Sequence, residues 1–389
     1  MHILSIHNLY QIRGGEDESC ESERRLLQDM GHTVDVYEAD NKIISTLNPL
    51  RAAVKTIWST PAYRDVTRLA QKSSYDIAHI QNFFPLLSPS VHYAAKASGI
   101  PVIQTIRNYR LLCPNALFFR DNQVCEDCLG RFVPWPAVAH GCYRQSKAAS
   151  LAVATMLTVH RMLPTWTKQV DAYIALTQFS RQKMIEGGLP KEKIFVKPNF
   201  VHPDPGVGEG QGGFALFVGR LSVEKGLDTL LSAWRLLKYK IPLKIIGDGP
   251  LADQVQSAAQ EVPWIEWLGR KPLVEVYELI GQARFLVFPS KWYETFGRVA
   301  IEAFAKSTPV IAADIGAIAE LIEEGRTGIK FRPGDPQDLA EKVEWLLDHP
   351  VELNQMRQEV RIAYETQYTA KQNYQQLMNI YEQVARNCS

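Results

Sequence analysis

Short, continuous apolar segments alternate with longer amphipathic segments along most of this chain. In the first half, the apolar segments are Ile3–Ile6, Thr33–Tyr37, Ile77–Ile80, Val102–Ile106 and Tyr173–Ala175. After residue 210 they are Phe214–Val218, Leu243–Ile246, Ile265–Leu268, Phe285–Phe288 and Val310–Ala312. Strands that are apolar along their whole length are typical of parallel sheets covered by helices on both faces. The pattern predicts an α/β protein with two Rossmann-like, doubly wound domains facing a central cleft.

The length of 389 residues also favours two domains, because a single core usually stops growing at about 250–300 residues. The Pro- and Gly-rich segment 197–213 reads as the linker. We therefore expect an N-terminal domain over 1–203 and a C-terminal domain over 204–365. A final helix, at about 366–389, either packs on the second domain or returns to the first.

The net charge of +1 conceals an asymmetry between the two halves. Residues 1–203 hold 23 Lys and Arg against 17 Asp and Glu, and the remainder holds 20 against 25. The small net charge argues against a nucleic-acid binder. The basic half reflects either chance or contact with an anionic partner, such as a membrane surface or a phosphorylated acceptor. The chain opens directly on a strand-like segment without a charged leader, so we expect a cytoplasmic protein, peripheral at most to the inner face of a membrane.

Two loops at strand ends of the second half carry candidate ligand-binding residues. Ligands of open α/β sheets bind beyond the carboxyl ends of the strands. After Phe214–Val218 come Gly219, Arg220 and Lys225, and two cations there suit a diphosphate, although basic residues are also common in ordinary surface turns. After Leu243–Ile246 come Gly247 and Gly249, which permit close backbone approach to a ligand or simply form a tight turn.

The segment after Phe285–Phe288 is the richest in candidates. We expect a helix to begin near Gly297, so that the amides of Thr295, Phe296 and Gly297 face an anion. Glu294 precedes this helix and Glu302 lies within it, so the two carboxylates could hold hydroxyls on two parts of one extended ligand. The alternative is that Glu294 stabilises the helix dipole and Glu302 is solvated.

The first strand is followed by Gly14 and Gly15, which could admit a phosphate or sugar to the backbone. The acidic residues Glu16, Asp17 and Glu18 that follow disfavour a phosphate on the helix itself. A purely structural glycine pair is an equally good interpretation.

Taken together, these segments resemble the family 4 retaining glycosyltransferases, which have the GT-B fold. The resemblance rests on Gly219-Arg220-x4-Lys225-Gly226, Gly247-Asp248-Gly249-Pro250, and the pair Glu294 and Glu302 within an E-x7-E pattern. It is looser in the first half, where it covers Gly14-Gly15 and the segment 175–180.

The resemblance implies transfer of a sugar from a nucleotide-diphosphate sugar to a hydroxyl acceptor, in polysaccharide, exopolysaccharide or glycolipid assembly. Arg220 and Lys225 would neutralise the diphosphate, Glu294 would bind the transferred sugar, and Glu302 would hold the ribose. Gly15 would approach the diphosphate and sugar from the opposing domain. The resemblance favours UDP over GDP or ADP, a saccharide or lipid-linked acceptor, and catalysis without a metal ion. A sugar-nucleotide epimerase and a non-catalytic nucleotide-sugar-binding scaffold remain as alternatives.

The sequence departs from the family at the end of the fourth strand. Many relatives carry a histidine there, whereas this chain has Arg107. Arg107 could meet the sugar, the diphosphate or an anionic acceptor. His79, on the preceding strand, is interpreted as structural.

Four of the six cysteines, Cys113, Cys125, Cys128 and Cys142, fall within an insertion over 113–142 that lacks a clear helix or strand pattern. An insertion with few core residues needs a cross-link to stabilise it, and four thiolates can bind a structural zinc ion. Redox or incidental cysteines, with His140 as a substitute ligand, are the alternative. Cys20 and Cys388 are interpreted as incidental.

After this insertion, residues 147–168 form an amphipathic helical pattern that Pro164 should kink or end. Core packing and membrane contact are both compatible with this pattern.

Overall fold

The computed structural model describes residues 1–11 and 14–388, except for the side chains of residues 45 and 388. The chain divides into two compact units. The first comprises Met1–Phe118, Cys125–Pro198 and Asn373–Ser389, and the second comprises Phe119–Val124 and Asn199–Gln372. The sequence prediction divided the chain after residues 203 and 365 instead.

The first unit is built on a six-stranded sheet in the order β2-β1-β3-β4-β7-β8. The strands are β1 (His2–Leu9), β2 (Thr33–Asp40), β3 (Ile77–Asn82), β4 (Val102–Ile106), β7 (Ala172–Ala175) and β8 (Ile194–Val196), and all neighbours run parallel. Every residue of β3, β4 and β7 is buried, as expected for a parallel sheet covered on both faces.

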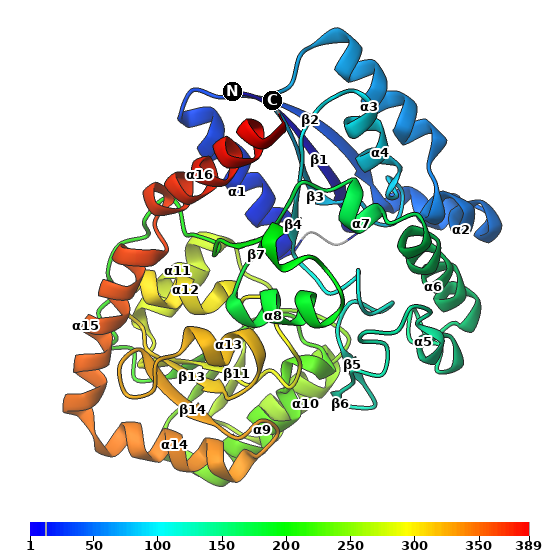
Figure 1. The fold of residues 1–389 in the computed structure, drawn as a ribbon. Coiled ribbons are helices and arrows are strands. Elements are labelled where there is room, and N and C mark those ends of the chain that lie inside the picture. The colour runs from blue at the N-terminus through cyan, green and yellow to red at the C-terminus, as the bar shows by residue number, and fades with distance from the viewer. Residues whose placement is uncertain (12–13, 389) are drawn as a thin grey trace. The chain divides into compact units, whose positions relative to one another are not determined.

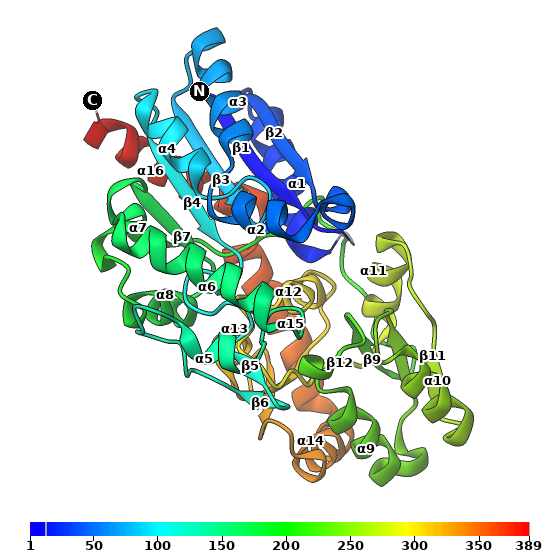
Figure 2. The same cartoon turned by 90° about the vertical axis from the view of Figure 1, so that its right-hand side faces the viewer.

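Helices cover both faces of this sheet. They are α1 (Gly15–Asp29), α2 (Pro49–Ile57), α3 (Thr60–Lys72), α4 (Ser90–Ala97), α5 (Trp135–Ala139), α6 (Lys147–Met162), α7 (Thr165–Lys168), α8 (Gln178–Glu186) and α16 (Ala370–Cys388), with 3-10 turns η1 (Asn41–Thr46) and η2 (Lys191–Lys193). Leu27 of α1 and Leu377, Ile380 and Tyr381 of α16 pack on the same sheet face. Figures 1 and 2 show α3 and α4 on the opposite face.

The end of the chain returns to the first unit through a buried polar contact as well as apolar packing. Lys197, which follows β8, donates from Nζ to Glu23 Oε2 at 2.7 Å and to Asn373 Oδ1 at 3.0 Å. The Asn373 side chain donates in turn to the carbonyl of Pro198 at 2.6 Å. All three side chains are almost completely buried, so α16 is fixed to the first sheet.

The second unit has its own six-stranded parallel sheet in the order β11-β10-β9-β12-β13-β14. The strands are β9 (Ala215–Val218), β10 (Leu243–Ile246), β11 (Ile265–Trp267), β12 (Phe285–Phe288), β13 (Val310–Ala313) and β14 (Gly328–Phe331). The helices are α9 (Leu227–Leu237), α10 (Ala252–Glu261), α11 (Leu273–Gln282), α12 (Arg298–Ala305), α13 (Gly316–Leu321), α14 (Pro336–Asp348) and α15 (Pro350–Gln367), with 3-10 turns η3 (Val223–Lys225) and η4 (Lys238–Lys240).

The segment expected to be a linker is largely bound to the second unit. Gly208 donates to the carbonyl of Lys306 at 3.0 Å, and Gly210 donates to that of Gly281 at 2.8 Å. A Cβ atom at Gly208 would lie 2.2 Å from the Cα of Gly281. The glycines of this segment thus allow close backbone packing, and residues after 198 form part of the second unit.

The ten predicted strands are all present, so the predicted α/β class with two parallel sheets is confirmed. The sequence analysis missed the edge strand β8, which has only three residues, the edge strand β14, which contains Lys330, and the hairpin of β5 (Phe119–Arg120) and β6 (Gln123–Val124). Pro164 ends the helix expected over 147–168, which stops at Met162 and is followed by α7. In the part of the chain that the structure describes, no helix is long and apolar enough to cross a membrane.

Candidate functional site

At the carboxyl edge of the second sheet, glycines bring two loops into direct contact. Gly247 and Gly249 follow β10 and have φ values of 144° and 155°. A Cβ atom at Gly247 would lie 1.8 Å from the carbonyl oxygen of Gly219, and one at Gly249 would lie 2.6 Å from that of Leu221. Both glycines are therefore required by packing against the loop that follows β9, and only glycine fits there.

The same β9 loop carries the two predicted cations. Arg220 is exposed, whereas Lys225 ends the turn η3 and its side chain is 22% exposed. Gly226 comes next with φ of 70°, and a Cβ atom there would lie 1.9 Å from the carbonyl oxygen of Pro289. Close contact between the loops after β9 and β12 thus fixes the backbone beside Lys225.

Lys225 and Glu294 form an ion pair at the centre of this edge. Lys225 Nζ donates to Glu294 Oε1 at 2.6 Å. Ser290 Oγ and Trp292 Nε1 donate to the same carboxylate oxygen, each at 2.9 Å. Glu294 is only 7% exposed, so this carboxylate is held in one position by three donors. The Lys225 ammonium also lies 5.5 Å from the centroid of the Trp292 ring.

Glu302 is held separately, on the helix that follows. As predicted, α12 begins next to Gly297, which has φ of 115° and precedes Arg298. Glu302 is 4% exposed, and Arg298 Nε donates to its Oε1 at 2.9 Å. Glu302 is therefore not a solvated surface residue. Thr295 is partly buried, and the ring of Phe296 is buried in the core of this unit.

Two further residues of this edge were missed by the sequence analysis. Lys291 donates from Nζ to Asp228 Oδ2 at 2.6 Å and from its backbone amide to the carbonyl of Glu224 at 2.8 Å. No local spacing connects Lys291 with Asp228, since 63 residues separate them. Arg298 could have been found, because its four-residue spacing from Glu302 is typical of a helical ion pair.

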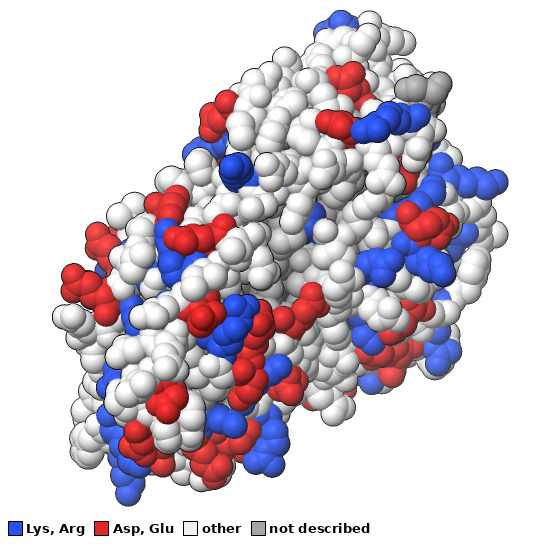
Figure 3. Space-filling view, turned by 60° about the vertical axis from the view of Figure 1, so that its left-hand side comes forward, with Lys and Arg blue, Asp and Glu red and all other residues white. Residues whose placement is uncertain are grey.

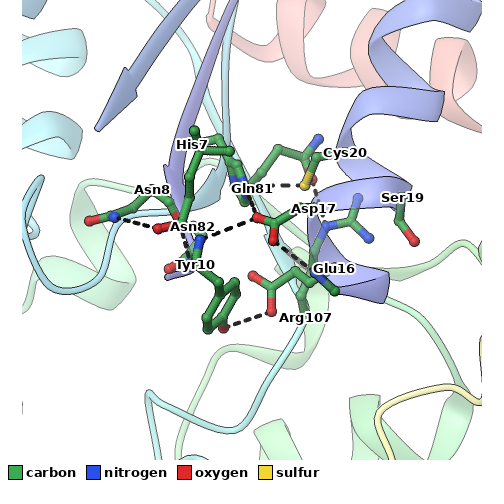
Figure 4. Close-up of polar contacts among 12 residues, drawn as sticks. His7, Asn8, Tyr10, Glu16, Asp17, Ser19, Cys20, Gln81, Asn82 and Arg107 are labelled. Carbon is green, nitrogen blue, oxygen red and sulfur yellow. Dashed lines mark hydrogen bonds and ion pairs between the residues drawn. The ribbon is translucent and has the colours of Figure 1, made fainter. Parts of the chain in front are cut away.

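The carboxyl edge of the first sheet carries a second polar cluster, shown in Figure 4. The register between β1 and β3 shifts at His7, at the point where β1 enters the cluster. His7 Nε2 donates to Asp17 Oδ1 of α1 at 2.8 Å, and both residues are 3% exposed. Burial alone would lower the pKa of His7, but the hydrogen bonds with Asp17 and Cys20 raise that pKa to about 10.

Arg107 lies in the same cluster and is 8% exposed. Arg107 Nε donates to Gln81 Oε1 at 2.9 Å, and Gln81 Nε2 donates to Glu23 Oε1 at 2.6 Å. Gln81, Thr105, Arg107, Asn108 and Arg110 line a small cavity of about 20 Å³, roughly the room of one water molecule. Arg107 thus faces a small cavity at the sheet edge, which the apolar side chains of Phe83, Phe84, Ile106 and Leu111 also line.

Glu16 and Tyr10 border the same edge. Tyr10 Oη donates to Glu16 Oε2 at 2.9 Å (Figure 4), and Asn108 Nδ2 donates to the same oxygen at 3.4 Å. Burial raises the pKa of Glu16. His79 is bound on both ring nitrogens, at 2.6 Å from Tyr381 Oη and 2.7 Å from Thr105 Oγ1, and burial lowers its pKa to about 4.

Gly14 and Gly15 differ from the glycines of the second unit. Gly14 has extended backbone angles and precedes α1, and Gly15 is the first residue of that helix. A Cβ atom at either position would meet no atom within 4 Å among the described residues beyond the chain neighbours. Among the described residues, neither backbone angle nor packing requires glycine at these two positions.

The sequence analysis predicts a zinc ion at the four insertion cysteines. Among the residues that the structure describes, no three His, Cys, Asp or Glu side chains are arranged to hold a metal ion. The Cys113 thiol donates to Asn115 Oδ1 at 3.0 Å, and burial together with the neighbouring thiols raises the pKa of Cys128 to about 12. The structure thus gives no support to the structural zinc ion at Cys113, Cys125, Cys128 and Cys142, which stays a prediction.

Aromatic packing holds the start of the insertion, because Phe118 contacts Tyr109 just ahead of it. Tyr109 and Phe118 are completely buried, with ring centroids 5.0 Å apart. The Arg110 guanidinium lies 4.2 Å from the centroid of the Phe84 ring. Cys20, which was interpreted as incidental, lies in the first-sheet cluster with its sulfur 3.7 Å from His7 Nδ1. The side chain of Cys388 falls outside the described residues.

Comparison with known proteins supports the resemblance. Residues 207–363 match the family model described as glycosyl transferases group 1. An uncharacterized glycosyltransferase of Methanocaldococcus jannaschii is 33% identical over 185 residues, which cover 47% of this chain and 51% of the relative. The chain thus spans about half the length of this curated relative.

Solved structures match along the whole chain. Anabaena HepE in complex with UDP has a TM-score of 0.70 at 17% identity, covering 98% of this chain and 100% of HepE. A glycosyltransferase from Rickettsia africae has a TM-score of 0.71 at 16% identity, covering 99% of both chains. The second unit thus matches the glycosyl transferases group 1 family model over 207–363, and the chain, with its two parallel-sheet units, has the GT-B fold.

Proposed function

We propose that this protein is a retaining glycosyltransferase that transfers a sugar from a nucleotide-diphosphate sugar to a hydroxyl acceptor in polysaccharide or glycolipid assembly. The observation that carries the proposal is the pairing of Lys225 with Glu294 at 2.6 Å. It joins the cation and the carboxylate that the family pattern assigns to the diphosphate and to the transferred sugar.

The reaction requires stabilisation of negative charge on the leaving diphosphate. The bond between the anomeric carbon and the diphosphate oxygen breaks, and the electron pair leaves with the nucleotide. Arg220 and Lys225 neutralise this charge, together with the backbone amides of Thr295, Phe296 and Gly297. The acceptor oxygen forms the new bond on the same face of the sugar, and its proton passes to the departing diphosphate oxygen.

Positioning of the donor is assigned to the two glutamates. Glu294, fixed by Ser290 and Trp292, accepts hydrogen bonds from hydroxyls of the transferred sugar. Glu302 accepts from the ribose hydroxyls while Arg298 keeps its carboxylate in place. Gly219, Gly247 and Gly249 leave the neighbouring backbone uncovered by side chains.

Acceptor selection is assigned to the first unit. Arg107 and the adjacent cavity offer hydrogen-bond donors to an acceptor hydroxyl or an anionic group, and Gly14 and Gly15 leave room for a ligand beside α1. Saccharides and lipid-linked saccharides are the acceptor classes that fit these donors. UDP is the favoured donor nucleotide, since HepE has also been solved in complex with UDP-glucose.

The test is a donor screen with UDP-, GDP- and ADP-sugars, followed by thermal shift and by nucleotide release. We expect one nucleotide class to raise the melting temperature and to be released faster when a saccharide acceptor is added. Lys225→Ala and Glu294→Ala should each lower release by about 100-fold or more. Lys240→Ala, which breaks the exposed ion pair with Glu344 in the same unit, is the matched control and should retain full activity.

Other outcomes identify the alternatives. An epimerase would interconvert the donor without any acceptor, and a scaffold would bind the nucleotide sugar without turnover. The anomeric configuration of the product, read from its proton coupling constants, tests retention. An inverted product would contradict the proposed mechanism.

A further inference from the structure

The basic excess of the first unit is concentrated in two segments of sequence. Residues 41–64 and 128–170 together contain nine Lys and Arg and no Asp or Glu. These segments form α2, α5, α6 and α7 and the start of α3. An excess of positive charge that is confined to a few helices produces a locally positive electrostatic potential. The same excess spread over the whole unit would not.

The elements from these two segments lie together in the fold. Helix α6 packs against both α2 and α5, as Figures 1 and 2 show. His160 of α6 lies with Nε2 at 2.9 Å from the carbonyl oxygen of Ile57 at the end of α2. Arg161 donates to the carbonyl of Phe132, ahead of α5, at 2.9 Å. The three helices therefore form one continuous part of the surface.

Large apolar side chains are exposed on this surface. Leu50 and Val54 lie four residues apart on one side of α2, 78% and 65% exposed, and the exposed Trp58 caps the end of this helix. On α6 and beyond it, Leu151, Met162 and Leu163 are exposed. Phe132, Val133 and Trp135 add a third exposed group at the start of α5. We call these nine residues the apolar face.

The outward side of α6 carries no charge between its ends. Its partly exposed residues after Leu151 are Ala152, Thr155, Thr158 and Val159, and the first charged residue that follows is Arg161 in the last turn. A helix exposed to water normally carries charged residues on its outward side. The absence of charge there indicates that this side meets an apolar environment.

Exposed cations lie beside the apolar face. Arg51 lies between Leu50 and Val54 on α2, Lys147 begins α6, and Arg131 lies 5.7 Å from the ring of Trp135. On a different face of the molecule, Figure 3 shows acidic and basic side chains interspersed. Apolar side chains flanked by cations are typical of surfaces that lie on anionic lipid, and the two segments themselves contribute no carboxylate.

We propose that the apolar face docks on an anionic phospholipid surface. The nine side chains enter the boundary between headgroups and acyl chains, while Arg51, Arg131 and Lys147 contact the lipid phosphates. A second copy of the chain fits less well, because a two-fold interface would bring the cations of one copy close to the same cations of the other copy. This inference goes beyond the proposed function and does not rest on it, since none of these residues belongs to the donor site.

The test is co-sedimentation of the full chain with vesicles of phosphatidylcholine alone or with about 30% phosphatidylglycerol, at low salt and at about 0.5 M salt. We expect binding at least about tenfold stronger to the anionic vesicles, and weaker binding at high salt. The double variant Val54→Glu/Leu151→Glu should lower this binding by about tenfold or more. The matched control is Val351→Glu, at a position 64% exposed on α15 of the second unit, and it should bind as the native protein does.

Several results would overturn the proposal. Absence of binding to anionic vesicles would do so, and so would an equal loss of binding in Val351→Glu. A native dimer that the double variant dissociates would assign the face to a second copy instead. If the double variant fails to fold, Arg51→Glu and Leu50→Glu at exposed positions make the same test. Because the assay needs no sugar nucleotide, its failure would leave the donor screen unaffected.

Discussion

Lys225 and Glu294 meet at 2.6 Å although 69 residues separate them in the chain. The turn that ends at Gly226 positions the lysine, and Ser290 and Trp292 fix the carboxylate that receives it. A cation and a carboxylate are thus fixed side by side at the carboxyl edge of a parallel sheet, where ligands of α/β proteins bind.

Removing either member of this pair should have separable effects on stability and on activity. Lys225→Ala leaves the buried Glu294 without its cation, so we expect a loss of about 1–3 kcal/mol in the free energy of unfolding. The double variant with Glu294→Ala should lose less than the sum of the two single variants, by about 1–2 kcal/mol. Urea unfolding of the four proteins measures this coupling. Strictly additive losses would show that the two side chains do not interact in solution.

Gly247, which follows β10, and Gly15, which begins α1, should respond in opposite ways to alanine. At Gly247 the added Cβ atom would lie 1.8 Å from a carbonyl oxygen, so Gly247→Ala should cost about 2 kcal/mol or more and lower the melting temperature.

At Gly15 the added Cβ atom meets nothing within 4 Å among the described residues, so Gly15→Ala should preserve or slightly raise the melting temperature. Its effect should appear instead in nucleotide release with the identified donor, because the space beside α1 would be reduced. A Gly15→Ala protein with native kinetics would make Gly15 a structural residue only.

The His7–Asp17 pair should make stability depend on alkaline pH. The pKa of His7 is raised to about 10 in the folded protein, above the value of about 6.5 in an unfolded chain. The pair therefore contributes its full stability below about pH 6.5, and this contribution is lost as the pH rises through about 10. We expect a decline on the order of 2–4 kcal/mol across that range.

The variant Asp17→Asn isolates this effect. An asparagine can still accept from the amide of Gly14, as Asp17 does at 3.2 Å, but it removes the negative charge beside His7. The gap in unfolding free energy between native protein and variant should shrink from about pH 7 to about pH 10. A constant gap would mean that His7 does not retain its proton in the folded state.

The buried pair of Lys197 and Glu23 should be costly to break. Each side chain is 2–3% exposed, so Lys197→Met leaves a carboxylate buried without its cation and should cost about 3–5 kcal/mol. Lys240→Met, at the exposed pair with Glu344, should cost less than about 1 kcal/mol. Thermal and urea unfolding provide the comparison. Equal losses in the two variants would contradict the buried arrangement.

The double variant Lys197→Met/Glu23→Leu should recover part of the unfolding free energy that Lys197→Met loses. Replacing a buried ion pair with apolar residues costs less than leaving one charge buried without its partner. Since Asn373 of α16 shares Lys197, the single variant should also loosen α16. Faster hydrogen exchange over residues 370–388 would report this. Unchanged exchange there would show that apolar packing alone holds the helix.

The sequence by itself determined the strands, since a continuous apolar segment such as Phe285–Phe288 is stable only when both faces are covered. It also determined that α12 starts next to Gly297 and that α6 ends just before Pro164, because backbone geometry at glycine and proline is a local property. The candidate donor residues could also be predicted from the sequence, because their motifs lie within short segments of the chain.

Only the tertiary structure decided which of these residues meet. Lys291 with Asp228 and Arg107 with Gln81 are pairs between distant segments, and no local spacing encodes them. The four insertion cysteines are near one another in the sequence, but whether their thiols can share a metal ion depends on the fold, and no such arrangement is present among the described residues. The apolar face likewise emerges only when α2, α5 and α6 are brought side by side, since exposure is a property of the folded surface rather than of any one segment.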